Sequence, residues 1–261
     1  MFTERSLSGE VAGVREAHAP DALVVDTARD FETLDPAVAE DLLLLTDAVD
    51  PVTYDRSWLP ADAPEELQRF AGSDFTVGMP GDGGVAWTRQ TDPPCVFVKP
   101  RLAGSPEGFV DFLLAEALVE VGLGVPEHFL GFFRDVYPEF ADVARSRLGA
   151  ADTYQLAAAL YDAYVGLETR PVFADWDGEY PRLFDAWVDA GERLEPRLGD
   201  LSREVARGQT RFAAAAELAC SAVKHGLDLP APFAALDTDA YRDHGPDYAL
   251  KWTETTFQKL G

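Results

Sequence analysis

The chain has 261 residues, of which 47% are hydrophobic, and a formal net charge of -24 at pH 7. This apolar content is ample for a sizeable core, which excludes a disordered chain. The charge argues against direct binding of DNA or RNA, because contacts to phosphates need a basic stripe and the sequence shows none.

The acidic excess consists of carboxylates spread along the whole chain and opposed mainly by arginine. Such a surface suits a cytoplasm with multimolar salt, since about 1 M salt shortens the Debye length to about 3 Å and screens the repulsion between carboxylates. The alternative is an acidic surface that mimics nucleic acid or captures basic partners, which would more often cluster its charge. We therefore expect the charge to reflect a halophilic habitat.

Targeting signals and cysteine motifs are not evident in the sequence. The first 18 residues lack the apolar core of a signal peptide, and the longest apolar runs are too short to span a bilayer. The two cysteines, Cys95 and Cys220, belong to no metal-binding spacing. The sequence thus predicts a soluble cytoplasmic protein with no membrane association, no disulfide framework and no zinc knuckle.

The first 72 residues are expected to contain helices, one extended segment and a loop. Asp35 caps and Pro36 begins the clearest helix, whose apolar spacing continues to Val49. The other elements expected here are a helix at 8–18, a strand or sheet edge at 22–25 and a short helix at 64–70.

Residues 73–102 are expected to form a small antiparallel β-meander. The segments DFTVGM, VAWTRQ and CVFVKPRL are the three candidate strands. The glycine-rich stretch GMPGDGG, residues 78–84, precedes one of these strands instead of a helix. We therefore interpret it as a hairpin turn rather than a phosphate-binding loop.

Residues 105–260 are expected to be helical, and no repeat or low-complexity linker divides the chain. The expected helices lie at 106–121, at 126–148 with a break before Pro138, and at 152–168, 180–198, 200–225 and 239–260. We therefore predict an α+β fold in one predominantly α-helical domain over residues 1–261. Its parts are N-terminal helices and a loop (1–72), the meander (73–102) and the helical region (105–260).

A local basic group is unexpected in a chain with so few lysines. Arg89, Lys99 and Arg101 lie on the second and third strands of the predicted meander. They are candidates for binding an anionic ligand. The simpler interpretation is that they neutralise acidic neighbours.

The helix at 106–121 is apolar on nearly every side, which is typical of a buried helix. Glu116 and Glu120, four residues apart, fall on one side of it. Two buried carboxylates at this spacing need an arginine, a metal, another cation or a raised pKa, so they are the catalytic candidates. A structural ion pair or a solvent-exposed face is the simpler alternative. His128, just past the helix, is a weak candidate for a metal ligand, and we expect no metal or other cofactor.

A small antiparallel sheet followed by a helix with a central glutamate resembles the zincin metalloproteases, in which HExxH supplies two zinc ligands and a general base. The aligned frame here is AEALV, residues 115–119, which keeps the glutamate and lacks both histidines. The resemblance implies at most a degenerate zincin-like scaffold without zinc ligands, on which zinc peptidase chemistry should not occur.

Two segments, AGSDFTVGMPGDGGVAWTRQTDPPCVFVKPRLAGSP and FVDFLLAEALVEVGL, together with the acidic, lysine-poor composition, resemble an uncharacterised haloarchaeal protein family, a domain of unknown function. The resemblance covers most of the chain. It implies a cytoplasm rich in potassium chloride, and it transfers no catalytic residues.

Two functions therefore remain open. The favoured one is a non-enzymatic interaction or structural module that acts through an unidentified protein partner, because no complete catalytic constellation is present. The alternative is an enzyme, or a binder of a small anionic ligand or metal, that uses Glu116 and Glu120 together with the basic group.

Overall fold

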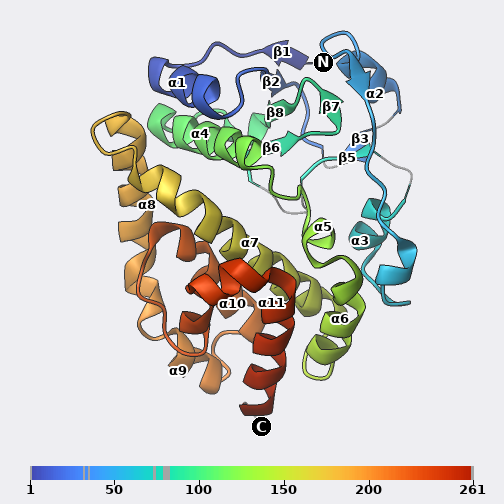
Figure 1. Ribbon diagram of the computed structural model, residues 1–261, viewed down its shortest axis with the longest axis vertical. Coiled ribbons are helices and arrows are strands. Elements are labelled where there is room, and N and C mark those ends of the chain that lie inside the picture. The colour runs from blue at the N-terminus through green and yellow to red at the C-terminus, as the bar shows by residue number, and fades with distance from the viewer. Residues whose placement is uncertain (1, 32, 35, 73–74, 79–82, 260–261) are drawn as a thin grey trace. The chain divides into compact units, whose positions relative to one another are not determined.

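Helices make up most of the computed structural model, beside a small mixed sheet, which confirms the predicted fold class (Figure 1). The structure describes residues 2–31, 33–34, 36–72, 75–78 and 83–259. Contacts group the chain into two compact units. Unit 1 comprises residues 1–54, 69–128 and 176–186, and unit 2 comprises residues 55–68, 129–175 and 187–261. That the chain is a single domain stays a prediction.

The main sheet of unit 1 has four strands in the order β1-β2-β8-β6. Their bounds are β1 Phe2–Glu4, β2 Leu23–Thr27, β8 Cys95–Val98 and β6 Val85–Thr88. The central pair, β2 and β8, is parallel, and the outer pairs are antiparallel. Every residue of β8 is buried, as expected for a central strand whose two faces are both covered.

Helices α1 (Gly9–His18) and α4 (Glu107–Leu123) pack against each other, and α4 also packs on β6 and β8 (Figure 1). The all-round apolar character of α4 fits this burial. The two helices approach closely at Gly122, where an added Cβ would lie 2.3 Å from the carbonyl oxygen of His18. Gly124, at a φ of 70°, ends α4 in the left-handed conformation.

The three predicted strands of the meander do not pair consecutively. β6 and β8 pair antiparallel as expected, but β5 (Phe75–Thr76) pairs with β3 (Thr33–Leu34), and β8 has β2 as its other neighbour. The cause is apolar burial, since Phe75 and Phe97 share a core cluster with Val25 of β2. The middle of the predicted hairpin turn, residues 79–82, lies outside the described residues.

The helix predicted to run from Pro36 to Val49 ends early. Helix α2 spans Pro36–Leu42, and β4 (Ala48–Val49) pairs with β7 (Thr91–Asp92). Leu42 is buried in the core, whereas Leu44 is 83% exposed, so continuing the helix would bury little more apolar surface.

Unit 2 is helical and is arranged around α7, which packs against α5, α6, α10 and α11. Its elements are 3₁₀ turns at Arg56–Trp58, Arg134–Val136, Val223–His225 and Phe233–Leu236, with α5 Phe129–Phe133, α6 Tyr137–Arg145, α7 Ala150–Ala174, α9 Leu201–Ala206, α10 Phe212–Ser221 and α11 Asp239–Lys259. Two helices, α3 (Glu65–Phe70) and α8 (Pro181–Leu198), contribute residues to both units.

Two boundaries in this region differ from the sequence expectation. α7 continues through Pro171 to Ala174, where it buries Phe173 completely. The single helix expected at 200–225 is divided by Gly208, whose φ of 67° is left-handed.

Over the described residues, no helix has the length and apolar content that crossing a membrane requires.

Candidate functional site

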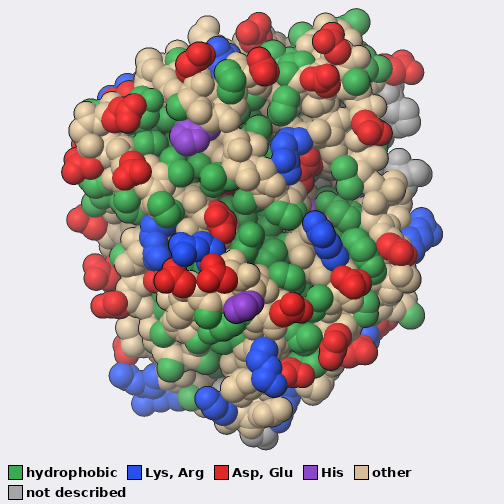
Figure 2. Space-filling view, viewed as in Figure 1, with side chains coloured by type: hydrophobic (Ala, Val, Ile, Leu, Met, Phe, Trp, Pro, Cys, Tyr) green, Lys and Arg blue, Asp and Glu red, His purple; other side chains and the backbone are tan. Residues whose placement is uncertain are grey.

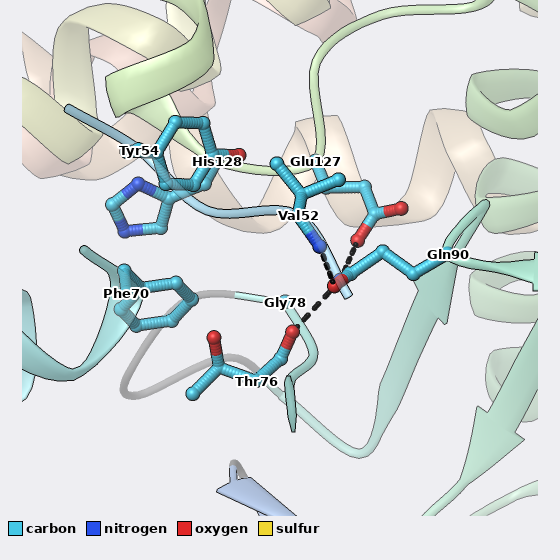
Figure 3. A pocket seen from close by; sticks show the side chains of 8 residues that line it. All are labelled: Val52, Tyr54, Phe70, Thr76, Gly78, Gln90, Glu127 and His128. Carbon is cyan, nitrogen blue, oxygen red and sulfur yellow. Dashed lines mark hydrogen bonds between the residues drawn. The ribbon is translucent and has the colours of Figure 1, made fainter. Parts of the chain in front are cut away.

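A small pocket in unit 1 brings Gln90, which follows β6, together with Glu127 and His128, which follow α4 (Figure 3). It is lined by Val52, Tyr54, Phe70, Thr76, Gly78, Gln90, Glu127 and His128. Its volume is about 10 Å³, which is the room that a single water molecule needs. The pocket could therefore hold a water molecule or take part in a proton transfer, but it has little space for a substrate.

Glu127 is the centre of the hydrogen bonds at this pocket. The hydroxyl of Thr88 donates to its two carboxylate oxygens at 3.0 and 2.9 Å, and the side-chain amide of Gln90 donates to one of them at 2.7 Å. The backbone N–H of Arg89 donates as well. Burial raises the pKa of Glu127, while these hydrogen bonds and the charge of Arg89 oppose that rise. The carboxylate is thus already engaged by its own chain.

Gln90 extends this network to two further segments. Its amide nitrogen also donates to the carbonyl oxygen of Thr76 at 2.8 Å, and its amide oxygen accepts from the backbone N–H of Val52 at 2.8 Å (Figure 3). Glu127 and Gln90 therefore join four separate stretches of unit 1, which is a structural role.

His128 is buried beside them and is 1% exposed. Its ring stacks on Phe70 with 4.0 Å between centroids, and Tyr54 lies 5.9 Å away. Burial lowers the pKa of His128 to about 3, so the imidazole is neutral at pH 7. Burial, and then the charge of Glu127, raise the pKa of Tyr54. Within the described ranges, His, Cys, Asp and Glu form no group of three that could hold a metal ion.

Both predicted carboxylates, Glu116 and Glu120, are half-buried on α4. The indole N–H of Trp87 on β6 donates to Glu120 at 2.6 Å. The guanidinium of Arg89 lies over the ring of Trp87, 5.9 Å from its centroid, and donates to the carbonyl oxygens of Gly124 and Val125 at 3.1 and 2.8 Å. Arg89 thus neutralises the C-terminal end of α4. That Glu116 and Glu120 are catalytic stays a prediction.

The predicted basic group is divided between the two ends of the β6–β8 ladder. Arg89 follows one end, whereas Lys99 follows the other, where its backbone N–H donates to the carbonyl of Gly84. Arg101 pairs with Asp30 at 2.5 Å, and the ammonium of Lys99, whose side chain is 0% exposed, lies 4.0 Å from the same carboxylate. Lys99 and Arg101 thus lie against the same acidic neighbour, and that the basic group binds an anionic ligand stays a prediction.

A larger opening lies in unit 2, between α8 and the turn after α10. This opening, hereafter the groove, has a volume of about 130 Å³. It is lined by Trp187, Val188, Gly191, Glu192, Glu195, His225 and Leu227. The rings of Trp187 and His225 stack with 6.1 Å between centroids and 23° between planes. Its lining thus combines aromatic and aliphatic surface with two exposed carboxylates.

Sequence reasoning named neither Glu127 nor the groove. The partners of Glu127 stand 37 to 39 residues earlier in the chain, so no local spacing marks it. The groove had a partial signal, because Trp187, Gly191 and Glu195 are four residues apart and share one face of a helix.

The comparison with protein families matches residues 1–260 to a family described as "Family of unknown function (DUF7089)". The chain therefore belongs to this family. Comparisons with curated proteins and with solved structures found no match.

Proposed function

We propose that this protein is a non-enzymatic module that binds a protein partner, and that the partner docks at the groove. The observation that carries the proposal is the composition of the groove, in which a stacked Trp187 and His225 pair adjoins the exposed carboxylates of Glu192 and Glu195. Aromatic residues are enriched at protein interfaces, and a hollow with a few polar groups is the usual form of a binding site.

The hydrogen bonds of Glu127 also support a non-enzymatic function. A catalytic carboxylate must offer a lone pair to its substrate, but that of Glu127 already accepts from Thr88, Arg89 and Gln90. Glu120 likewise accepts from Trp87. A protein partner is also a better proposal than a nucleic acid, because the net charge of -24 repels phosphates.

Affinity capture in strong potassium chloride tests this function. Val188 lines the groove and is 37% exposed, so Val188→Arg adds a long cationic side chain at the groove without removing core packing. The parent protein is expected to retain a reproducible partner from a lysate of its source, and Val188→Arg is expected to reduce that signal at least about tenfold, which corresponds to about 1.4 kcal/mol.

The matched control is Gln209→Arg, which adds the same side chain at an exposed position that does not line the groove. It should capture the partner as the parent does. The proposal is wrong if Val188→Arg retains the partner in full, or if the parent retains none.

We also propose that the protein works in a salt-rich cytoplasm. On the face shown in Figure 2, acidic side chains are scattered widely and outnumber basic ones, in keeping with a net charge of -24. Raising potassium chloride from about 0.1 M to about 1 M shortens the Debye length from about 10 Å to about 3 Å, which reduces the repulsion within the folded chain.

The midpoint of thermal unfolding, measured by circular dichroism, is expected to rise by roughly 5–10 °C over this range of salt, equivalent to about 2–3 kcal/mol for a chain of this size. Glycine betaine at matched osmolality is the control, since it is excluded from protein surfaces without screening charge. A midpoint that stays constant or falls with potassium chloride would argue against a salt-adapted surface.

A further inference from the structure

We infer that the groove receives an arginine side chain of the partner protein, a conclusion that rests on the proposed docking function. The groove offers aromatic faces and carboxylates within one hollow, and the guanidinium group is the protein side chain that uses both together. A cavity of about 150 Å³ holds a benzene molecule, so 130 Å³ is enough for a planar group of similar size.

The aromatic part of the groove is held in place by its own chain. The indole N–H of Trp187 donates to the carbonyl oxygen of Lys224 at 3.0 Å, and Phe173 meets its ring edge to face at 6.3 Å. Gly191 allows α8 to lie close to His225, because an added Cβ would be 3.2 Å from the Cβ of that histidine. A ligand would therefore meet a preformed surface and would not have to order it.

The acidic part comes from Glu192 and Glu195, three residues apart on α8. Residues at this spacing share one side of a helix, and both side chains line the groove. A guanidinium carries five N–H donors in a planar fork, so it can pair with a carboxylate while its face stacks on an aromatic ring.

Among the residues that the structure describes, the neighbouring arginines pair with carboxylates other than these two. Arg193 pairs with Asp189 at 2.6 Å, and Arg170 pairs with Asp237 at 2.8 Å. The charge that the lining residues present to a ligand is therefore negative at neutral pH, which suits a cationic partner.

Arginine fits this surface better than lysine because of the salt in which we propose the protein works. Concentrated salt weakens a bare charge contact, whereas the stacking of a weakly hydrated guanidinium persists. A lysine ammonium is more strongly hydrated and cannot pair and stack as a plane.

Titration with short capped peptides tests the inference. The probes are glycine-arginine-glycine and the same peptide with lysine or with glutamine in place of arginine. Binding is measured from the indole N–H signal of Trp187 in nuclear magnetic resonance spectra of the full chain. The arginine peptide is expected to bind at least about tenfold more tightly than the glutamine peptide, and to bind more tightly than the lysine peptide in strong potassium chloride.

The double variant Glu192→Gln and Glu195→Gln is expected to bind the arginine peptide at least about tenfold more weakly than the parent does, because the substitutions remove both charges and keep the side-chain shapes. The control, Asp142→Asn with Asp247→Asn, removes two exposed carboxylates of unit 2 that do not line the groove, and it should bind as the parent does.

Equal binding of the arginine and glutamine peptides, no binding of either, or full binding by the double glutamine variant would overturn the inference. These outcomes are separate from failure of the docking function. A partner that is captured by the parent and lost in Val188→Arg leaves docking in place even when the peptides fail to discriminate.

Discussion

Acidification is expected to remove stability through His128, by about 2 kcal/mol of unfolding free energy at about pH 5. The folded pKa is about 3, against an ordinary value of 6.5, because the ring is buried. Between these values the unfolded chain binds a proton that the folded chain does not. The contribution is therefore complete above about pH 6.5 and is lost as the pH falls towards 3, with a limit of about 5 kcal/mol for 3.5 units at about 1.36 kcal/mol each.

The measurement is denaturant unfolding at a series of pH values, for the parent and for His128→Gln, which does not titrate. Glu127 has a raised pKa and so changes stability in the opposite direction, while His18 has a lowered pKa and changes it in the same direction. Both residues remain in the variant, so the difference between the two curves isolates His128.

The variant is expected to be less stable near neutral pH, because stacking on Phe70 is lost, and to approach or overtake the parent on acidification. His244→Gln serves as the control, since His244 is exposed on α11. Parallel curves for the parent and His128→Gln would show that the buried ring does not contribute to the pH dependence.

The second large effect is expected from Gly122→Ala, which should lower the unfolding free energy by about 1–3 kcal/mol. The new Cβ would lie 2.3 Å from the backbone oxygen of His18 and 2.9 Å from its carbonyl carbon. A flexible side chain could move aside, but a backbone carbonyl cannot, so α1 and α4 would have to separate. Chemical denaturation at constant pH and salt measures the change.

Gly108→Ala in the same helix is the matched control, because an added Cβ there meets nothing within 4 Å. It is expected to be neutral or to stabilise by up to about 1 kcal/mol through helix propensity. Both substitutions restrict the unfolded chain alike, so their difference reports the contact with His18. Equal stabilities for the two variants would contradict the close approach.

Local patterns predicted the elements well where one chain segment decides its own structure. The apolar period placed α4 to within two residues, and Gly124 ends it as a glycine at that position should. The run at 22–25 predicts a strand or the edge of a sheet, but the interior position of β2 depends on its pairing with β8, some seventy residues later. The pairing and register of strands so far apart in the chain cannot be predicted from a short stretch of sequence.

The candidate sites show the same division. Glu116 and Glu120 were found because their spacing on one helix is visible in the sequence, whereas Glu127 is held by donors from another part of the chain. The groove joins α8 to His225, which follows Trp187 by 38 residues. Helix periodicity identifies the face of α8 that lines the groove, but not the element that faces it.

The assembly of unit 1 from distant segments has a consequence for synthesis on the ribosome. The carboxylate of Glu10 in α1 accepts from the backbone N–H groups of Arg182 and Leu183, which lie 172 and 173 residues further along the chain. At about 5–20 residues per second, the first turn of α1 waits roughly 10–35 s for these donors. Unit 1 is therefore completed late in translation. A nascent chain that stops before residue 176 still lacks one of the three segments of unit 1.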